Sequence, residues 1–251
     1  MKRKDLLAYV DEYLKIDEIE DYGPQGLQVE VENSTVDRIA LAVDTAPAII
    51  EAAAAWQADL LLVHHGIFWG TQETITGPLG RRVRLLMKKD INLYAAHLVL
   101  DAHPVVGNNA VMAKMFNISL DEWWCPVKGT PIGVIGESPA GMTLSELVNQ
   151  VEGKLDTQAR VFAYGPKEAG RVAIISGFGA DEAAAAKAQG ADTFLTGETS
   201  HSHFWAASDL GLNIIYAGHY ATETVGLKAF GQHLTEKFNL EIKFLDFPTE
   251  M

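Results

Sequence analysis

Short apolar runs alternate along this chain with longer, alanine-rich segments, and the alternation predicts strands separated by helices. The runs in the first half have the length of buried strands. They are residues 38–43, 60–63 and 91–95. Pro47 fits the first turn of a helix through Ala55, with Asp44 or Thr45 as its N-cap. This order predicts an α/β fold with parallel strands joined by helical crossovers.

The second half of the chain repeats the plan of the first. Residues 171–175 match 38–42, and 191–195 match 58–62 at the same spacing. Later, "LYAAHLVLD" (93–101) parallels "IYAGHYATE" (215–223). The last match pairs His97 with His219 and Asp101 with Glu223. Several matches in the same order predict two similar α/β halves that arose by internal duplication.

The predicted halves cover residues 1–125 and 126–251. No low-complexity linker marks the boundary, so we expect the halves to pack closely. The stretch Tyr22–Gln28, which contains two glycines and a proline, predicts a turn that enters a strand.

Composition narrows the range of partners. The net charge of −13 argues against binding to extended nucleic acid or to an anionic membrane, because both require a basic face. A small anionic ligand stays possible, since a local cavity can hold cations. The single cysteine, Cys125, forms no internal disulfide and fits a reducing compartment. No apolar run has the length of a membrane span, and we expect a cytoplasmic protein.

Histidine and carboxylate residues follow several of the predicted strands. Imidazole and carboxylate are the usual ligands of zinc, iron and manganese, which often occur in pairs at hydrolytic sites. Ligands of open α/β sheets bind outside the carboxyl ends of the strands. The candidate donors are His64, His65, His97, Asp101, His103, His219 and Glu223.

Each group of donors also has a plainer interpretation. The adjacent histidines after residue 63 could be incidental, and His97 with Asp101 could be a local hydrogen-bonded pair. His219 and Glu223, four residues apart, could be an ordinary pair on a helix surface. If these residues were only surface charges, their positions after the predicted strands would be unrelated to one another. One metal site between the halves explains them together.

Five motifs carry a resemblance that spans nearly the whole chain. They are "GLQVE" (26–30), "HHG" (64–66), "HLVLD" (97–101), "TGE" with "SHSH" (196–203) and "GHYATE" (218–223). In this order they resemble the GTP cyclohydrolase 1 type 2 homologues, the Nif-three-like dinuclear-metal proteins. The resemblance implies two similar α/β halves with a two-metal site between them, and assembly as a ring-shaped homohexamer.

The resemblance also implies a ligand set. His64 and Asp101 would ligate one divalent ion, His65 and His219 the other, and Glu223 would bridge both. The donors accept zinc, iron, manganese or nickel, so the sequence does not choose the metal.

Such a site predicts a hydrolase acting on a small anionic or nucleotide-like molecule. Water activated by two ions would attack either a purine ring, as the family name implies for GTP, or a phosphate ester. The alternative is a metal-binding assembly or regulatory protein without catalysis.

Four further residues are candidates for acid–base or substrate contacts. His97 would orient Asp101 or a water, with direct ligation of a metal as the alternative. Glu198, His201 and His203 occupy the second-half equivalent of the His64 turn and would face the same cavity. Their plainer interpretation is a polar helix start after Gly197.

Overall fold

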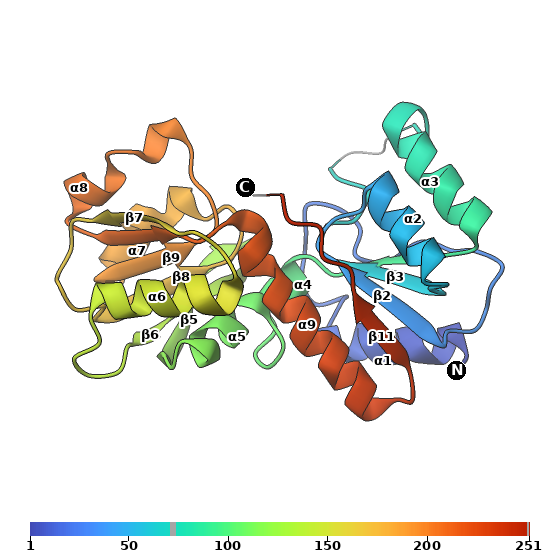
Figure 1. Ribbon diagram of the computed structural model, residues 1–251, viewed down its shortest axis with the longest axis horizontal. Coiled ribbons are helices and arrows are strands. Elements are labelled where there is room, and N and C mark those ends of the chain that lie inside the picture. Colours follow the sequence, from blue (N-terminus) through green and yellow to red (C-terminus); the bar gives the residue numbers. More distant parts are fainter. Residues whose placement is uncertain (71–73, 250) are drawn as a thin grey trace. The chain divides into compact units, whose positions relative to one another are not determined.

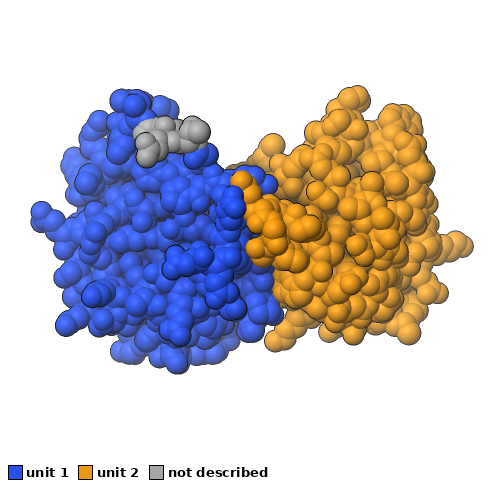
Figure 2. Space-filling model, turned by 180° about the vertical axis from the view of Figure 1, so that it is seen from behind, with its two compact units in different colours: residues 1–106, 227–247 blue, residues 107–226, 248–251 orange. Residues whose placement is uncertain are grey.

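The computed structural model describes residues 1–70, 74–249 and 251, and it confirms the predicted α/β class (Figure 1). The chain divides into two compact units, coloured separately in Figure 2. Unit 1 comprises residues 1–106 and 227–247, and unit 2 comprises residues 107–226 and 248–251. The units divide the chain differently from the predicted halves, and the position 125/126 lies inside β5 (Ser119–Val127). The predicted boundary between duplicated halves, at residues 125 and 126, stays a prediction.

Unit 1 contains a five-stranded sheet in the order β1-β4-β3-β2-β11. Four of its strands are parallel neighbours, and β1 is antiparallel to β4. The strands are β1 (Gly26–Val29), β2 (Arg38–Ala42), β3 (Leu60–Val63), β4 (Asn92–Ala95) and β11 (Glu241–Phe244). Strands at 38, 60 and 92 confirm the predicted ones, and β1 confirms the strand expected after the Tyr22 turn.

Helices cover the sheet of unit 1 because the strands are apolar on both faces, as parallel strands usually are. Ile50 of α2 and Leu86 of α3 are fully buried and pack in one core with Leu61 of β3. In Figure 1, α2 and α3 lie on the same side of the sheet. The helices are α1 (Arg3–Leu14), α2 (Pro47–Ala55), α3 (Gly77–Lys89) and α4 (Leu98–Asp101).

The predicted N-cap of α2 is wrong. Pro47 is the first helical residue, as expected, but the cap position is Ala46, which has no capping side chain. Thr45 donates its hydroxyl to the carbonyl of His65 instead. Asp44 accepts a hydrogen bond from the His65 ring, so both predicted caps serve the loop after β3.

Unit 2 contains a six-stranded sheet in the order β5-β6-β8-β9-β10-β7, in which β8, β9 and β10 are parallel. The remaining strands are β6 (Thr130–Glu137), β7 (Arg160–Ala163), β8 (Arg171–Ile175), β9 (Thr193–Thr196) and β10 (Asn213–Tyr216). The longer helices are α5 (Asn108–Met115), α6 (Leu144–Leu155) and α9 (His219–Lys237), which begins in unit 2 and ends in unit 1. The short ones are η1 (Ala180–Glu182), α7 (Ala183–Ala188), η2 (His201–His203) and α8 (Ala206–Leu210).

The two units share one topology. Each has a helix and a strand that lies antiparallel at the sheet edge, followed by three parallel strands with helical crossovers. Thus α1-β1 corresponds to α6-β7, and β2-β3-β4 corresponds to β8-β9-β10. This shared order of elements agrees with internal duplication.

Across the described part of the chain, no helix is long and apolar enough to cross a bilayer.

Candidate metal-binding groups

Three histidines of unit 1 lie together at the carboxyl ends of β3 and β4. Their ring centroids are 4.8 Å apart for His64 and His65, and 5.0 Å apart for His64 and His97. His65 and His97 are 5.6 Å apart. One ring nitrogen from each lies within 4.8 Å of the others, close enough for the three rings to surround bound cations. The adjacent histidines are therefore not directed to opposite faces, because β3 ends at Val63 and the chain turns there.

Each of these rings is held through its Nδ1 atom. The Nδ1 of His64 lies 2.9 Å from the carbonyl oxygen of Ala96, so it donates to that oxygen. The Nδ1 atoms of His65 and His97 lie 2.8 Å from carboxylates. The carboxylates belong to Asp44 and Asp21, respectively. Metal-ligating histidines are oriented by such partners, which leave the lone pair on Nε2 for the ion.

Asp101 supplies a carboxylate to the same group. It is buried in α4, and its Oδ2 lies 3.6 Å from Nε2 of His64. His64 itself is fully buried. A buried imidazole and a buried carboxylate at this separation are costly unless they share a charge or an ion.

Asp21 and Asp44 are not among the predicted site residues, although both hold histidines of this group. Burial raises the pKa of Asp21, but the hydrogen bond and charge of His97 and the N–H groups of Leu98 and Tyr22 outweigh burial and lower it. Asp44 lies two residues after the end of β2, at the same sheet edge as the histidines, so its position in the sequence could have marked it as a candidate. Asp21 lies in a loop between helix and strand, where no pattern marks it.

Two motifs meet behind the histidine turn. The amide of Gln28, in "GLQVE", accepts a hydrogen bond of 2.8 Å from the N–H of Ile67. A Cβ at Gly66, in "HHG", would lie 2.3 Å from the same amide oxygen, closer than any real contact. Glycine at this position therefore allows the strand that carries Gln28 to support the turn.

In unit 2, three donors meet at the start of α9. Nε2 of His219 lies 3.0 Å from Oε1 of Glu223, one helical turn later. Its Nδ1 lies 3.3 Å from Oε1 of Glu198, which follows β9. The start of a helix at His219 and the pairing four residues on are as predicted. Glu198 thus lies beside His219, and its predicted role as an acid–base or substrate contact stays a prediction.

The environment of His219 strongly favours its protonated form. Burial lowers its pKa, but hydrogen bonds and charge from Glu223 and Glu198 outweigh this and raise the pKa to about 9. Both ring nitrogens face carboxylates, so the metal-free ring is held as an imidazolium. A divalent cation next to Nε2 would replace the charge of that proton.

The loop after β8 closes tightly on these donors. Gly177 has φ of +64°, and a Cβ there would lie 2.3 Å from Oε1 of Glu223. Its N–H donates to the hydroxyl of Thr222 over 3.0 Å. The backbone of this loop therefore fixes the first turn of α9 and the carboxylate it carries.

The other predicted histidines have separate surroundings. His103 is buried against Tyr13, and its Nε2 lies 3.1 Å from the Tyr13 carbonyl. His203 contacts Asp181 at 2.6 Å. His201 is exposed and lines a small pocket. None of the three appears in the groups of metal-type donors found among the described residues.

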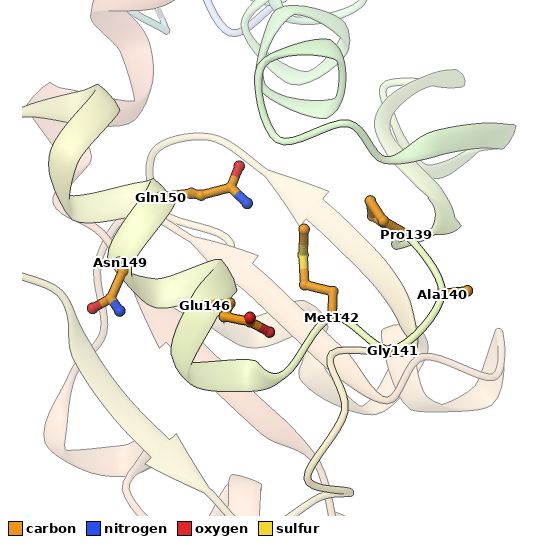
Figure 3. Close-up of a pocket in the computed structure, with 7 residues that line it drawn as sticks. All are labelled: Pro139, Ala140, Gly141, Met142, Glu146, Asn149 and Gln150. Atoms are coloured by element: carbon orange, nitrogen blue, oxygen red, sulfur yellow. The ribbon is translucent and has the colours of Figure 1, made fainter.

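A larger pocket of unit 2, of about 400 Å³, lies between α6 and the loop before it (Figure 3). Its lining contains one charged side chain, Glu146. That carboxylate is engaged in a capping box with Thr143 at the start of α6. The pocket thus offers shape but no group for catalysis.

The donor chemistry fits divalent cations. Unit 1 supplies three imidazoles and a carboxylate, and unit 2 supplies an imidazole and two carboxylates. Neutral imidazole and carboxylate are suited to zinc, iron and manganese, while no thiolate is present among these described donors to select softer ions. The fold and these groups define an α/β protein with donors that could hold metal ions at the carboxyl ends of its strands.

Comparison with known proteins identifies the family. The chain belongs to the Duf34/NIF3 (NGG1p interacting factor 3) family, whose sequence profile matches residues 1–250. It is 41% identical to a GTP cyclohydrolase 1 type 2 homolog of Pyrococcus abyssi, over 99% of both chains. A protein of the same name from Deinococcus radiodurans is 40% identical, over 98% of this chain and 94% of its own. The crystal structure of TTHA1606 from Thermus thermophilus matches with a TM-score of 0.89 and 39% identity, over 100% of each chain. The resemblance seen in the motifs is confirmed.

Proposed function

We propose that this protein is a dinuclear metal-dependent hydrolase of a small anionic molecule. The observation that carries the proposal is the arrangement of His64, His65 and His97, each held through Nδ1 with one ring nitrogen within 4.8 Å of the others. Building such a group costs stability, since it gathers polar side chains in a partly buried place. A bound cation offsets that cost.

The ligand assignment follows the family resemblance and is part of the proposal. We assign His64 and Asp101 to one ion, His65 and His219 to the other, and Glu223 to both. Two divalent ions held by these residues would supply an activated water and would neutralise developing negative charge. Five protein ligands shared by two ions would leave coordination positions open, which favours catalysis over a closed structural site.

The remaining residues have positioning and proton-transfer roles in this proposal. His97, whose Nδ1 donates to Asp21, is held in place to orient Asp101 or a water beside the ions. Glu198 accepts from Nδ1 of His219 and keeps Nε2 directed toward Glu223. The surroundings of His97 and Glu198 thus resemble the carboxylate–histidine pairs of general acid–base catalysis.

The test begins with protein purified without chelator or affinity tag. Elemental analysis gives metal identity and stoichiometry, and the loaded protein is then assayed with GTP and a panel of phosphate esters. Formate and phosphate release are followed separately, because ring opening yields the first and ester hydrolysis the second. Absence of turnover at full occupancy contradicts the hydrolase and favours a metal-binding assembly or regulatory protein.

Three further properties belong to the same proposal. We propose a homohexamer, a cytoplasmic location and a nucleotide-like small molecule as the partner. Sedimentation equilibrium of the loaded protein tests the first, and a monomer or dimer would contradict it.

A further inference from the structure

A second, smaller pocket of unit 2 lies beside the Glu198 loop. It has a volume of about 200 Å³ and lies between the edge strand β7 and the segment after β9. Whole drug-sized ligands usually occupy about 300–1,000 Å³, so this pocket suits one group of a larger molecule. Its lining residues are Arg160, Phe162, Thr199, Ser200, His201 and Phe204.

Arg160 is the charged centre of this pocket. Its guanidinium carbon lies 5.1 Å from the centre of the Phe162 ring, a cation–π contact that restrains the side chain. No aspartate or glutamate is among the lining residues, although the whole chain carries a net charge of −13. An exposed, positioned guanidinium with no lining acid favours an anion.

The other lining residues extend the same chemistry. Thr199 and Ser200 contribute hydroxyl groups, and His201 contributes a ring that can donate a hydrogen bond. The hydroxyl of Ser200 also lies 2.7 Å from Oγ of Ser202 and 2.9 Å from Nδ1 of His203. Phe162 and Phe204 contact each other edge to face, with centroids 5.3 Å apart, and form the apolar wall. Hydroxyls and a guanidinium against an aromatic wall fit the phosphoryl end of a ring-bearing ester.

The pocket shares a loop with the candidate metal-binding groups of its own unit. Thr199 follows Glu198, whose carboxylate lies 3.3 Å from Nδ1 of His219. A ligand that occupies the pocket therefore lies against the same loop that positions His219.

We propose that the Arg160 pocket is a phosphate-recognition subsite, which binds a phosphoryl group of a nucleotide substrate. The inference rests on the proposed function for the identity of the substrate. The binding of an anion to Arg160, in contrast, can be measured without any turnover.

The experiment compares GTP with guanosine on the full-length chain, both metal-loaded and treated with chelator. Calorimetry gives the affinities, and elemental analysis checks the metal content. We expect Arg160→Gln to weaken GTP binding about tenfold to hundredfold, the effect of losing charge-assisted hydrogen bonds, while guanosine binding and metal content do not change. Arg160→Lys should fall between, because it keeps the charge but loses the planar fork.

Lys167→Gln is the control for net charge, since it removes one exposed cation from the same unit. It should change GTP affinity less than about twofold, as expected for an exposed charge. Equal effects of the two substitutions, or no GTP binding by the wild type, would overturn the inference. If Arg160-dependent binding occurs without hydrolysis, the hydrolase proposal fails and the subsite stands. If GTP is hydrolysed and Arg160→Gln leaves KM unchanged, the hydrolase proposal stands and the subsite inference fails.

Discussion

Nε2 of His219 lies 3.0 Å from Oε1 of Glu223, and both side chains leave the first turns of the same helix, α9. The spacing of four residues places them on one face, with no loop between them to adjust. The carboxylate is buried, so it cannot be satisfied by bulk water. The pair is therefore a rigid element, prepared before any ion arrives.

Replacing one of these donors should remove metal without unfolding the chain. We expect Glu223→Ala and His64→Ala to lose at least one ion per chain, because each deletes a proposed ligand. Circular dichroism should stay that of the wild type. Glu236→Ala, an exposed carboxylate later on α9, is the matched control and should keep its metal. Unchanged metal content in Glu223→Ala, by elemental analysis, would contradict the assignment.

Asp44 should matter for metal affinity although we do not propose it as a ligand. Its carboxylate fixes the ring of His65 through a 2.8 Å hydrogen bond. The loss of a partner of this kind typically weakens metal binding by about 10–100-fold. We therefore expect Asp44→Asn to weaken metal binding by this factor in a competition titration with a chelator. Asp17→Asn, at an exposed position of the same unit, should leave affinity unchanged. Equal affinities in the two variants would show that His65 needs no such support.

The sequence predicted the candidate donors better than the carboxylates that orient their rings. His64, His65 and His97 could be found because they follow apolar strands, and strand ends are visible in a pattern of two-residue period or in a buried run. Asp21 could not be found in this way, since its pairing with His97 joins positions 76 residues apart through a loop. The prediction of the N-cap of α2 was wrong for a related reason. Thr45 and Asp44 form hydrogen bonds with His65, and these tertiary contacts outweigh the local capping preference.

Gly177 gives a sharper test of the site in unit 2. Alanine there would place Cβ 2.3 Å from Oε1 of Glu223, so we expect Gly177→Ala to displace that carboxylate and to lose metal. The Gly177→Ala substitution should also lower the free energy of unfolding by about 1–2 kcal/mol, because alanine is strained at this positive φ. Gly141→Ala is the matched control, because its φ is +75° but no atom lies within 4 Å of the added Cβ. Gly141→Ala should show the same backbone cost and full metal content. Metal loss in both variants would assign the effect to general destabilisation.

Stability in mild acid should depend on His103, which is separate from the proposed ligands. Burial lowers its pKa, and Nδ1 accepts hydrogen bonds from the N–H groups of Val105 and Val106, so a proton on Nδ1 would face two donors. The unfolded chain therefore binds this proton more readily than the folded chain does. The stabilising contribution is present above the ordinary histidine pKa of about 6.5 and is lost as pH falls from there through the lowered pKa.

The measurement is urea denaturation of chelator-treated protein between about pH 7.5 and 5, where one such proton changes the free energy of unfolding by at most about 1.4 kcal/mol per pH unit. His103→Asn keeps an acceptor for the two N–H groups but cannot titrate, so its stability should fall less steeply toward pH 5 than that of the wild type. His233→Gln provides the comparison, because burial also lowers the pKa of His233, while the side chain is less enclosed than His103. We expect His233→Gln to flatten the profile less than His103→Asn does. Identical slopes for the wild type and His103→Asn would mean that this buried ring does not govern acid sensitivity.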